Sequence, residues 1–171
     1  MTSIIRGSDN MDSARVSPVL ATAVTASGTA VDFTSIPSWV KRITVMFSGV
    51  STNGTSNIQV QLGDSGGIEN TGYLGSANTF DSGPSATNYT AGFLVVEQNV
   101  ATRLAHGLMT LANVSGNTWV ESHTLGLSVE GVISLGGGSK ALSDTLDRIR
   151  ITTVNGTDTF DAGTINILYE G

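Results

Sequence analysis

The sequence has no cysteine, only three prolines and no long apolar run. Without cysteine the chain forms no disulfide or zinc–thiolate site and offers no thiol nucleophile. No segment approaches the roughly 20 apolar residues of a membrane-spanning helix. Residues 1–7 also lack the apolar segment and cleavage site of an export signal, so we expect a protein that is made in the cytoplasm and does not insert into a membrane.

Charged side chains are scarce as well, at 13% of the 171 residues, and the formal net charge is −6. In typical soluble domains about a quarter of the residues are charged. An acidic chain without a basic segment lacks the phosphate-binding surface that nucleic-acid-binding proteins present. The composition therefore predicts no nucleic-acid partner.

Short alternating apolar runs take the place of helical patterns. Ile43, Val45 and Phe47 share one face of a predicted strand, and Pro37 bends the chain ahead of it. The pattern predicts one all-β domain, residues 19–171, folded as an antiparallel jelly-roll-like β-sandwich. The predicted strands are 19–26, 30–33, 40–48, 57–62, 91–96, 107–112, 118–125, 129–135, 147–154 and 163–169.

Turn residues predict how some strands are joined. Asn53-Gly54 predicts a tight hairpin between residues 40–48 and 57–62, because Asn-Gly readily adopts the positive φ angles of such turns. Ser115-Gly116-Asn117 predicts a second hairpin turn. Residues 76–87 are rich in Ser, Gly and Asn and predict a long exposed loop.

Two glycine-rich stretches resemble catalytic loops, and neither match holds. Gly63-Asp64-Ser65-Gly66-Gly67 matches the serine loop of chymotrypsin-like proteases, but His106 and His123 follow the serine instead of preceding it. Gly136-Gly137-Gly138-Ser139-Lys140 has the wrong residue order for a phosphate loop and precedes no good helix. We interpret the first as a turn and the second as a flexible break, and we expect no enzymatic activity and no cofactor.

Acidic turn residues could form one metal site. Asp158 and Asp161, with nearby Asp147, could form a calcium site, although Asp in a turn is more often structural. His106 and His123 have no carboxylate at metal-ligand spacing, and we interpret them as surface or partly buried residues.

Aromatic residues fall mostly at apolar strand positions, where core packing explains them. Asn88 and Tyr89 lie in a polar stretch, and Trp119 is also hard to assign. These three are the candidates for recognition at the surface, with core packing as the alternative for the two aromatic rings.

Residues 1–18 are polar and aperiodic and predict an arm that is held by a neighbouring subunit or a larger assembly. The side chains expected to dock this arm are Ile4, Ile5, Arg6, Met11 and Arg15.

Three segments resemble a β-domain common in structural proteins of tailed bacteriophages and prophages: Thr34–Phe47 (TSIPSWVKRITVMF), Gly49–Ser56 (GVSTNGTS) and Leu146–Gly163 (LDRIRITTVNGTDTFDAG). The resemblance covers roughly residues 28–171 and is weakest over residues 66–132. It implies a jelly-roll-like domain, usually trimeric and without enzymatic activity.

The resemblance also implies a place in the virion. Our first expectation is a tail-fibre-tip or baseplate-associated adhesin that contacts a glycan on the host surface through Asn88, Tyr89 and Trp119. The alternative is a capsid decoration protein that stabilises the phage head. In both roles the chain would form a homotrimer, and residues 1–18 would dock on other virion proteins.

Overall fold

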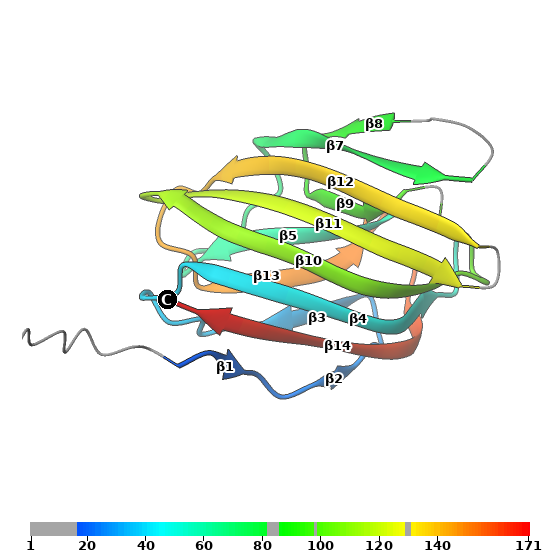
Figure 1. The fold of residues 1–171 in the computed structure, drawn as a ribbon, viewed down its shortest axis with the longest axis horizontal. Helices are drawn as coiled ribbons and strands as arrows, with labels where there is room; N and C mark the ends of the chain where they lie inside the picture. Colours follow the sequence, from blue (N-terminus) through cyan, green and yellow to red (C-terminus); the bar gives the residue numbers. More distant parts are fainter. Residues whose placement is uncertain (1–16, 82–85, 98, 129–130) are drawn as a thin grey trace, which may run out of the picture.

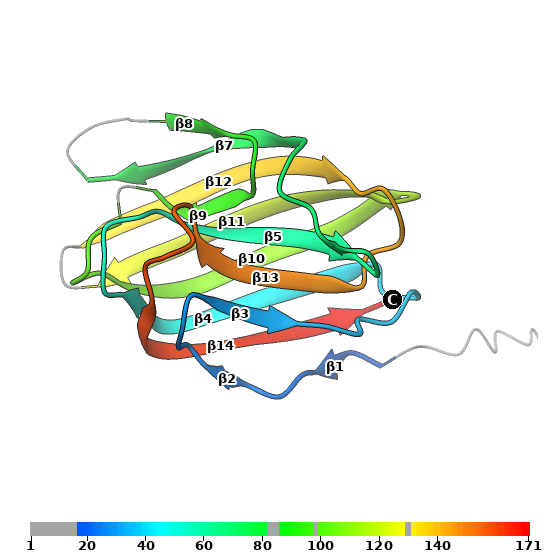
Figure 2. The ribbon, with the colours of Figure 1, turned by 180° about the vertical axis from the view of Figure 1, so that it is seen from behind.

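A computed structural model of the chain describes residues 17–81, 86–97, 99–128 and 131–171. Within these residues the chain forms strands and turns and no helix, and neighbouring strands pair antiparallel. The strands build two sheets packed face to face, the larger in front in Figure 1 and the smaller in front in Figure 2. The prediction of an all-β fold with antiparallel sheets is therefore confirmed.

The larger sheet has nine strands and the smaller sheet has five. In spatial order the large sheet contains β1 (Val19–Leu20), β14 (Phe160–Glu170), β4 (Arg42–Thr52), β10 (Leu104–Ser115), β11 (Thr118–Ser128), β12 (Val132–Ala141), β7 (Tyr73–Phe80) and β8 (Ala86–Tyr89), with β2 (Val24–Thr25) also paired to β14. The small sheet contains β3 (Ala30–Phe33), β13 (Arg148–Thr153), β5 (Ile58–Asp64) and β6 (Gly67–Ile68), with β9 (Phe93–Val96) also paired to β5.

The core lies between the sheets and is built by the alternating apolar residues of the sequence. Ile43 and Val45 of β4 and Ile149 and Ile151 of β13 have no exposed surface. Burying an aliphatic side chain of this size stabilises a fold by about 1.5–3 kcal/mol. The inward faces predicted for these two strands are therefore confirmed.

The tight hairpin predicted at Asn53-Gly54 is wrong. β4 belongs to the large sheet and β5 to the small sheet, so residues 53–57 cross from one sheet to the other. Neither Asn53 nor Gly54 has the positive φ angle of the predicted turn. Two strands with inward apolar faces can pair side by side or face each other across a sandwich, and alternation is the same in both cases. The predicted hairpin at Ser115-Gly116-Asn117 does join β10 and β11.

A second crossing loop, residues 154–159 between β13 and β14, contacts the first. The Asp158 carboxylate accepts hydrogen bonds from the Ser56 N–H at 2.9 Å and from the Asn155 side-chain amide at 2.8 Å. A Cβ atom at Gly54 would lie 2.0 Å from this carboxylate. Gly54 is therefore needed for close packing of the two crossing loops, and Asp158 holds them together.

The long loop predicted over residues 76–87 is also wrong. Most of these residues belong to β7 and β8, which pair with each other, and residues 82–85 lie outside the described part of the chain. Gly, Ser, Asn and Ala are poor strand formers and interrupt the pattern of these two strands, and the pairing of β7 with β12 holds them in the sheet.

The flexible break predicted at Gly136-Gly137-Gly138 lies inside β12. A Cβ atom at Gly136 would lie 2.5 Å from the His123 ring, and one at Gly138 would lie 2.4 Å from the Tyr89 hydroxyl oxygen. Two of these three glycines thus allow side chains of neighbouring strands to approach the backbone closely. Glycine has this use in strands as well as in flexible segments.

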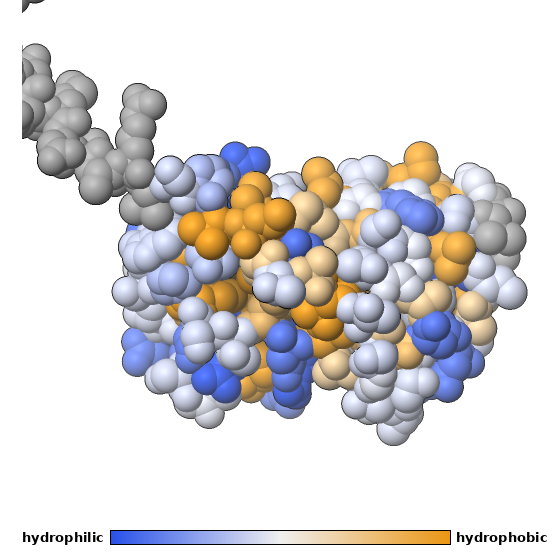
Figure 3. Space-filling model, turned by 90° about the horizontal axis from the view of Figure 1, so that it is seen from below, coloured by the Kyte–Doolittle hydropathy of each residue, from blue (hydrophilic) through white to orange (hydrophobic). Residues whose placement is uncertain are grey.

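One edge of the large sheet carries β1 and β2, with apolar residues gathered over it in Figure 3. The single strand predicted over residues 19–26 is instead two short strands, and between them the Asn166 side chain donates to the Ala21 carbonyl at 3.1 Å. Such irregular edges resist pairing with another sheet. The predicted docking side chains lie outside the described residues: Ile4, Ile5, Arg6, Met11 and Arg15.

Candidate functional site

The outer surface of β10, β11, β12, β7 and β8 forms the front of Figure 1 and carries no Asp, Glu, Lys or Arg among its described residues. We call this surface the uncharged face. Its outward side chains are His106, Leu108, Thr110, Ala112, Val120, Ser122, Thr124, Gly126, Ser128, Ile133, Leu135, Gly137, Ser139, Leu74, Ser76, Asn78, Phe80, Ala86 and Asn88. Glu121 and Lys140 of the same strands point inward. An acidic chain therefore presents one broad surface without formal charge.

Strand register arranges the centre of this face as a polar row. Thr110 pairs with Ser122, Ser122 with Gly137, Gly137 with Ser76, and Ser76 with Asn88. We call these five residues the hydroxyl row. It crosses five neighbouring strands at right angles to their direction, with about 4.8 Å from one strand to the next. Gly137 has no side chain, so the Ser122 and Ser76 hydroxyl groups are two strands apart.

Aliphatic side chains flank the hydroxyl row on both sides. Leu108 and Leu135 lie on one side, 53% and 42% exposed, and each pairs with Thr124 of the strand between them. Val120 and Leu74 lie on the other side, 38% and 70% exposed. Apolar side chains of this size are seldom gathered on a surface that stays in water.

The face is hollowed where glycine or small residues replace large ones. One shallow hollow of about 400 Å³ lies around Leu108, Thr110 and Ser122. A second hollow of about 270 Å³ lies between Phe80 and Leu135. Neighbouring ridges and hollows let a second protein surface interlock with this one.

The surface role predicted for Tyr89 and Trp119 is contradicted by their burial, since only 5% and 3% of these residues is exposed. Both lie on the inner face of their strands. The Tyr89 ring meets the Phe93 ring edge-on, with centroids 5.9 Å apart. Asn88, the third predicted recognition residue, is exposed and ends the hydroxyl row.

Tyr89 belongs to a buried polar cluster that the sequence did not predict. Its hydroxyl donates to Glu121 Oε1 at 2.7 Å, and Glu121 Oε2 lies 3.1 Å from His123 Nδ1. The Glu121 and His123 side chains have no exposed surface, and His123 Nε2 has no hydrogen-bond partner among the described residues. Burial, followed by the Glu121 charge, raises the pKa of Tyr89 well above its ordinary value. The cluster joins β8 to β11 inside the sandwich.

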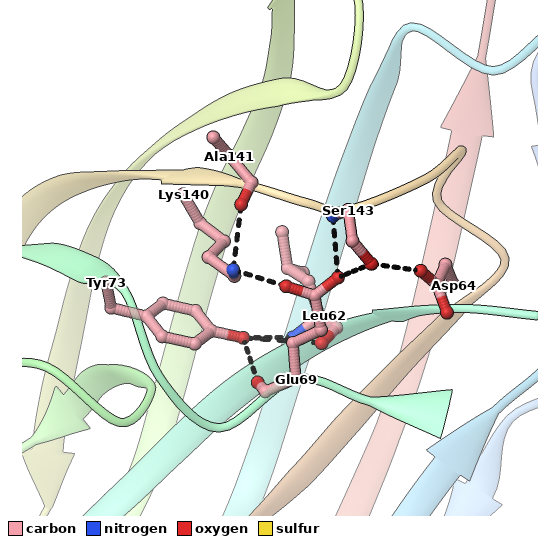
Figure 4. A network of polar contacts seen from close by, with 7 residues as sticks. All are labelled: Leu62, Asp64, Glu69, Tyr73, Lys140, Ala141 and Ser143. Atoms are coloured by element: carbon pink, nitrogen blue, oxygen red, sulfur yellow. Dashed lines mark hydrogen bonds and ion pairs between the residues drawn. The ribbon is translucent and has the colours of Figure 1, made fainter. Parts of the chain in front are cut away.

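A second polar network joins the two sheets at one end (Figure 4). Lys140 of β12 pairs with Glu69, which follows β6, and donates to the Ala141 carbonyl at 2.8 Å. Its amino group also lies 5.5 Å from the centre of the Tyr73 ring. Lys140, the lysine of the stretch that resembles a phosphate loop, thus makes contacts inside the protein.

Ser143 connects this network to the protease-like stretch. Its hydroxyl lies 2.7 Å from Asp64 Oδ2 and 2.8 Å from Glu69 Oε1. The Ser143 hydroxyl, followed by the Gly66 N–H, lowers the pKa of the Asp64 carboxyl from its ordinary value of 3.8. Burial pulls the pKa of Glu69 upward, but hydrogen bonds from Lys140 and Ser143 outweigh it and lower the pKa. Asp64 therefore serves as a structural acceptor here.

Replacing Ser143 with alanine is expected to raise the pKa of Asp64 toward 3.8, because the largest cause of its lowering is removed. A carboxyl whose folded pKa is lowered contributes stability above its unfolded pKa and loses it as the pH falls through the folded pKa. As the pH falls from about 4, the ordinary pKa of Asp, to the folded pKa of Asp64, the variant should therefore lose less stability than the parent. Carboxyl NMR titration of both proteins measures the pKa directly, and an unchanged Asp64 titration would contradict the assignment.

The remaining metal and nucleophile candidates are not brought together. His106 lies on the uncharged face, where its Nδ1 accepts from the Gly49 N–H at 3.1 Å, whereas His123 is inside. Asp161 accepts from the Ser51 hydroxyl, and Asp158 holds the crossing loops. The described part of the chain contains no cluster of three or more His, Asp or Glu side chains suited to a metal ion.

Nor does any helix in the described residues have the length and apolar character to cross a membrane. No protein-family model, curated protein or solved structure matches this chain.

Proposed function

We propose that this chain is a non-enzymatic structural protein of a tailed-phage particle and that it works by binding protein surfaces through the uncharged face. The size and chemistry of that face carry the proposal. Its exposed Leu, Ile, Val and Phe side chains surround neutral hydrogen-bonding groups, and the cores of protein interfaces are likewise poor in charge. A surface of this kind gains more from contact with a protein than from contact with water.

The arrangement of the resembling segments supports the particle assignment. Thr34–Phe47, Gly49–Ser56 and Leu146–Gly163 supply β4, β13 and both crossing loops, which contact each other through Asp158. Most of the uncharged face falls instead within residues 66–132, where the resemblance is weakest. A common framework that presents a variable surface is expected when related proteins bind different partners.

The finer features implied by the resemblance belong to the same proposal. We expect the sandwich to be a jelly-roll variant, the assembled protein to be a trimer, and residues 1–18 to dock on other virion proteins. These features would place the chain at a symmetric position of the particle, where repeated weak contacts add up.

Of the two virion roles, a contact with other particle proteins, as in capsid decoration, has the stronger support. The two aromatic residues expected to contact a glycan, Tyr89 and Trp119, are buried. An adhesin at the tail-fibre tip or baseplate is the second candidate. The hydroxyl row favours it, because its three hydroxyl groups and the Asn88 amide could hydrogen-bond to a glycan chain.

Copy number per particle tests the proposal and separates the two roles. We expect quantitative mass spectrometry of purified particles to find this chain in a fixed ratio to the major capsid protein. On the order of hundreds of copies would indicate a decoration protein, and a few to a few tens would indicate a tail protein. Absence of the chain from intact particles would contradict the proposal.

A further inference from the structure

The uncharged face is where a second copy of this chain can approach without electrostatic cost. The whole chain has a formal net charge of −6, so most pairs of surfaces from two copies repel each other. The described residues of the uncharged face carry no Asp, Glu, Lys or Arg. A charged partner would lose hydration on this face without gaining an opposite charge. Charge therefore favours a neutral partner, and the same face of another copy is neutral.

The size of the face suits a stable contact. Five neighbouring strands contribute to it, namely β10, β11, β12, β7 and β8. Strands about 4.8 Å apart and roughly 30 Å long cover on the order of 700 Å². A standard protein interface buries about 800 Å² on each partner. The face is thus large enough to form an interface without help from other surfaces.

The rows also make the face complementary to itself. Aliphatic side chains flank the hydroxyl row on both sides, with Leu108 and Leu135 on one side and Val120 and Leu74 on the other. Turning a second copy by 180° about the hydroxyl row places aliphatic side chains opposite aliphatic side chains. The hydroxyl row then meets its own copy, where hydroxyl groups can both donate and accept.

We propose that copies of this chain associate through the uncharged face, packed around a symmetry axis. The inference rests on the proposed function, because both assign protein contact to this face. It goes further in naming the occupant as a second copy and not another virion protein. The outward residues of β10, β11 and β12 then form the centre of the oligomer, and the charged edges stay in water.

Sedimentation analysis of the purified chain tests this inference. We expect the parent protein to have twice the monomer mass of 17.6 kDa, because a two-fold axis relates two copies. The trimer that the resemblance implies would have three times that mass and would overturn the two-fold pairing. Changing both Leu108 and Leu135 to Asp places carboxylates opposite the aliphatic Val120 and Leu74 of the second copy, where they are buried without an opposite charge. The dissociation constant should then rise on the order of 100-fold or more. The matched control is Val154→Asp, because Val154 is 53% exposed, as Leu108 is, but follows β13 in the small sheet.

The mass of the parent protein and of the two variants decides whether the inference holds. An oligomer that is lost in the double variant and kept in Val154→Asp supports the inference. A monomeric parent protein, or an oligomer that the double variant leaves intact, overturns it. Circular dichroism checks that the double variant is folded. If it is not, Ser122→Arg in the hydroxyl row replaces it with the same expected loss. A monomer that is nevertheless found in particles would overturn this inference alone, and an oligomer that is absent from particles would overturn only the virion role.

Discussion

Replacing Glu121 with alanine is expected to lower the free energy of unfolding by about 2–6 kcal/mol, because it leaves two buried polar groups without their partner at about 1–3 kcal/mol each. Glu121 accepts the Tyr89 hydroxyl at 2.7 Å and lies 3.1 Å from His123. Neither Glu121 nor His123 has side-chain surface in water, so the two partners left behind cannot be rehydrated without opening the sandwich. Urea denaturation followed by tryptophan fluorescence measures the change.

Glu121→Gln is the control for this prediction. Glutamine has nearly the same shape and keeps a carbonyl oxygen that can accept from Tyr89, so it should cost less than alanine. A loss below about 1 kcal/mol for Glu121→Ala, the range of an ordinary exposed substitution, would show that the cluster is not a buried interaction.

Replacing Gly138 with alanine is expected to destabilise the fold by about 2–3 kcal/mol through overpacking. The added Cβ atom would lie 2.4 Å from the Tyr89 hydroxyl oxygen and 2.6 Å from the Leu74 carbonyl oxygen. The Leu74 contact is to backbone within a paired strand, so relief requires the sheet to move. Thermal and urea denaturation of the two proteins should both show the loss.

The neighbouring Gly137 is a matched control on the same strand. It points outward, and a Cβ atom there would lie 3.5 Å from the Glu121 carbonyl oxygen, which is ordinary van der Waals contact. Gly137→Ala should therefore change stability by less than about 0.5 kcal/mol or raise it slightly. Equal losses at Gly137 and Gly138 would contradict the packing described for β12.

Alternation was sufficient to predict the inward faces of β4 and β13, and insufficient to predict which strands are neighbours. Ile43 and Val45 face inward as expected, because a period of two residues is fixed by strand geometry alone. Asn53-Gly54 was misinterpreted because a hairpin and a sheet-to-sheet crossing place the same residues inward. The choice depends on Asp158, about one hundred residues away in the sequence, which no local pattern reveals.

The candidate site was missed for a related reason. Trp119, Glu121 and His123 alternate on the inward face of β11, where two polar side chains make an inner face look like an outer one. The buried Glu121 carboxylate accepts a hydrogen bond from Tyr89, which comes from a different strand and cannot be located from the β11 sequence alone. When Trp119, Glu121 and His123 are known to point inward, the residues between them, such as Val120 and Ser122, must point outward, and none of them is charged. The same alternation applied to β12 gives a second strand with an uncharged outer side.

The measurement that most directly tests the account is incorporation of the Leu108→Asp/Leu135→Asp protein into particles. Particles produced with the parent chain, with this double variant and with Val154→Asp would be purified and quantified by mass spectrometry. We expect the parent and Val154→Asp proteins at equal copy number and the double variant at a small fraction of it, because a chain that cannot associate through the uncharged face loses the repeated contacts that hold the oligomer on the particle. Incorporation of the folded double variant at the parent level would contradict the account.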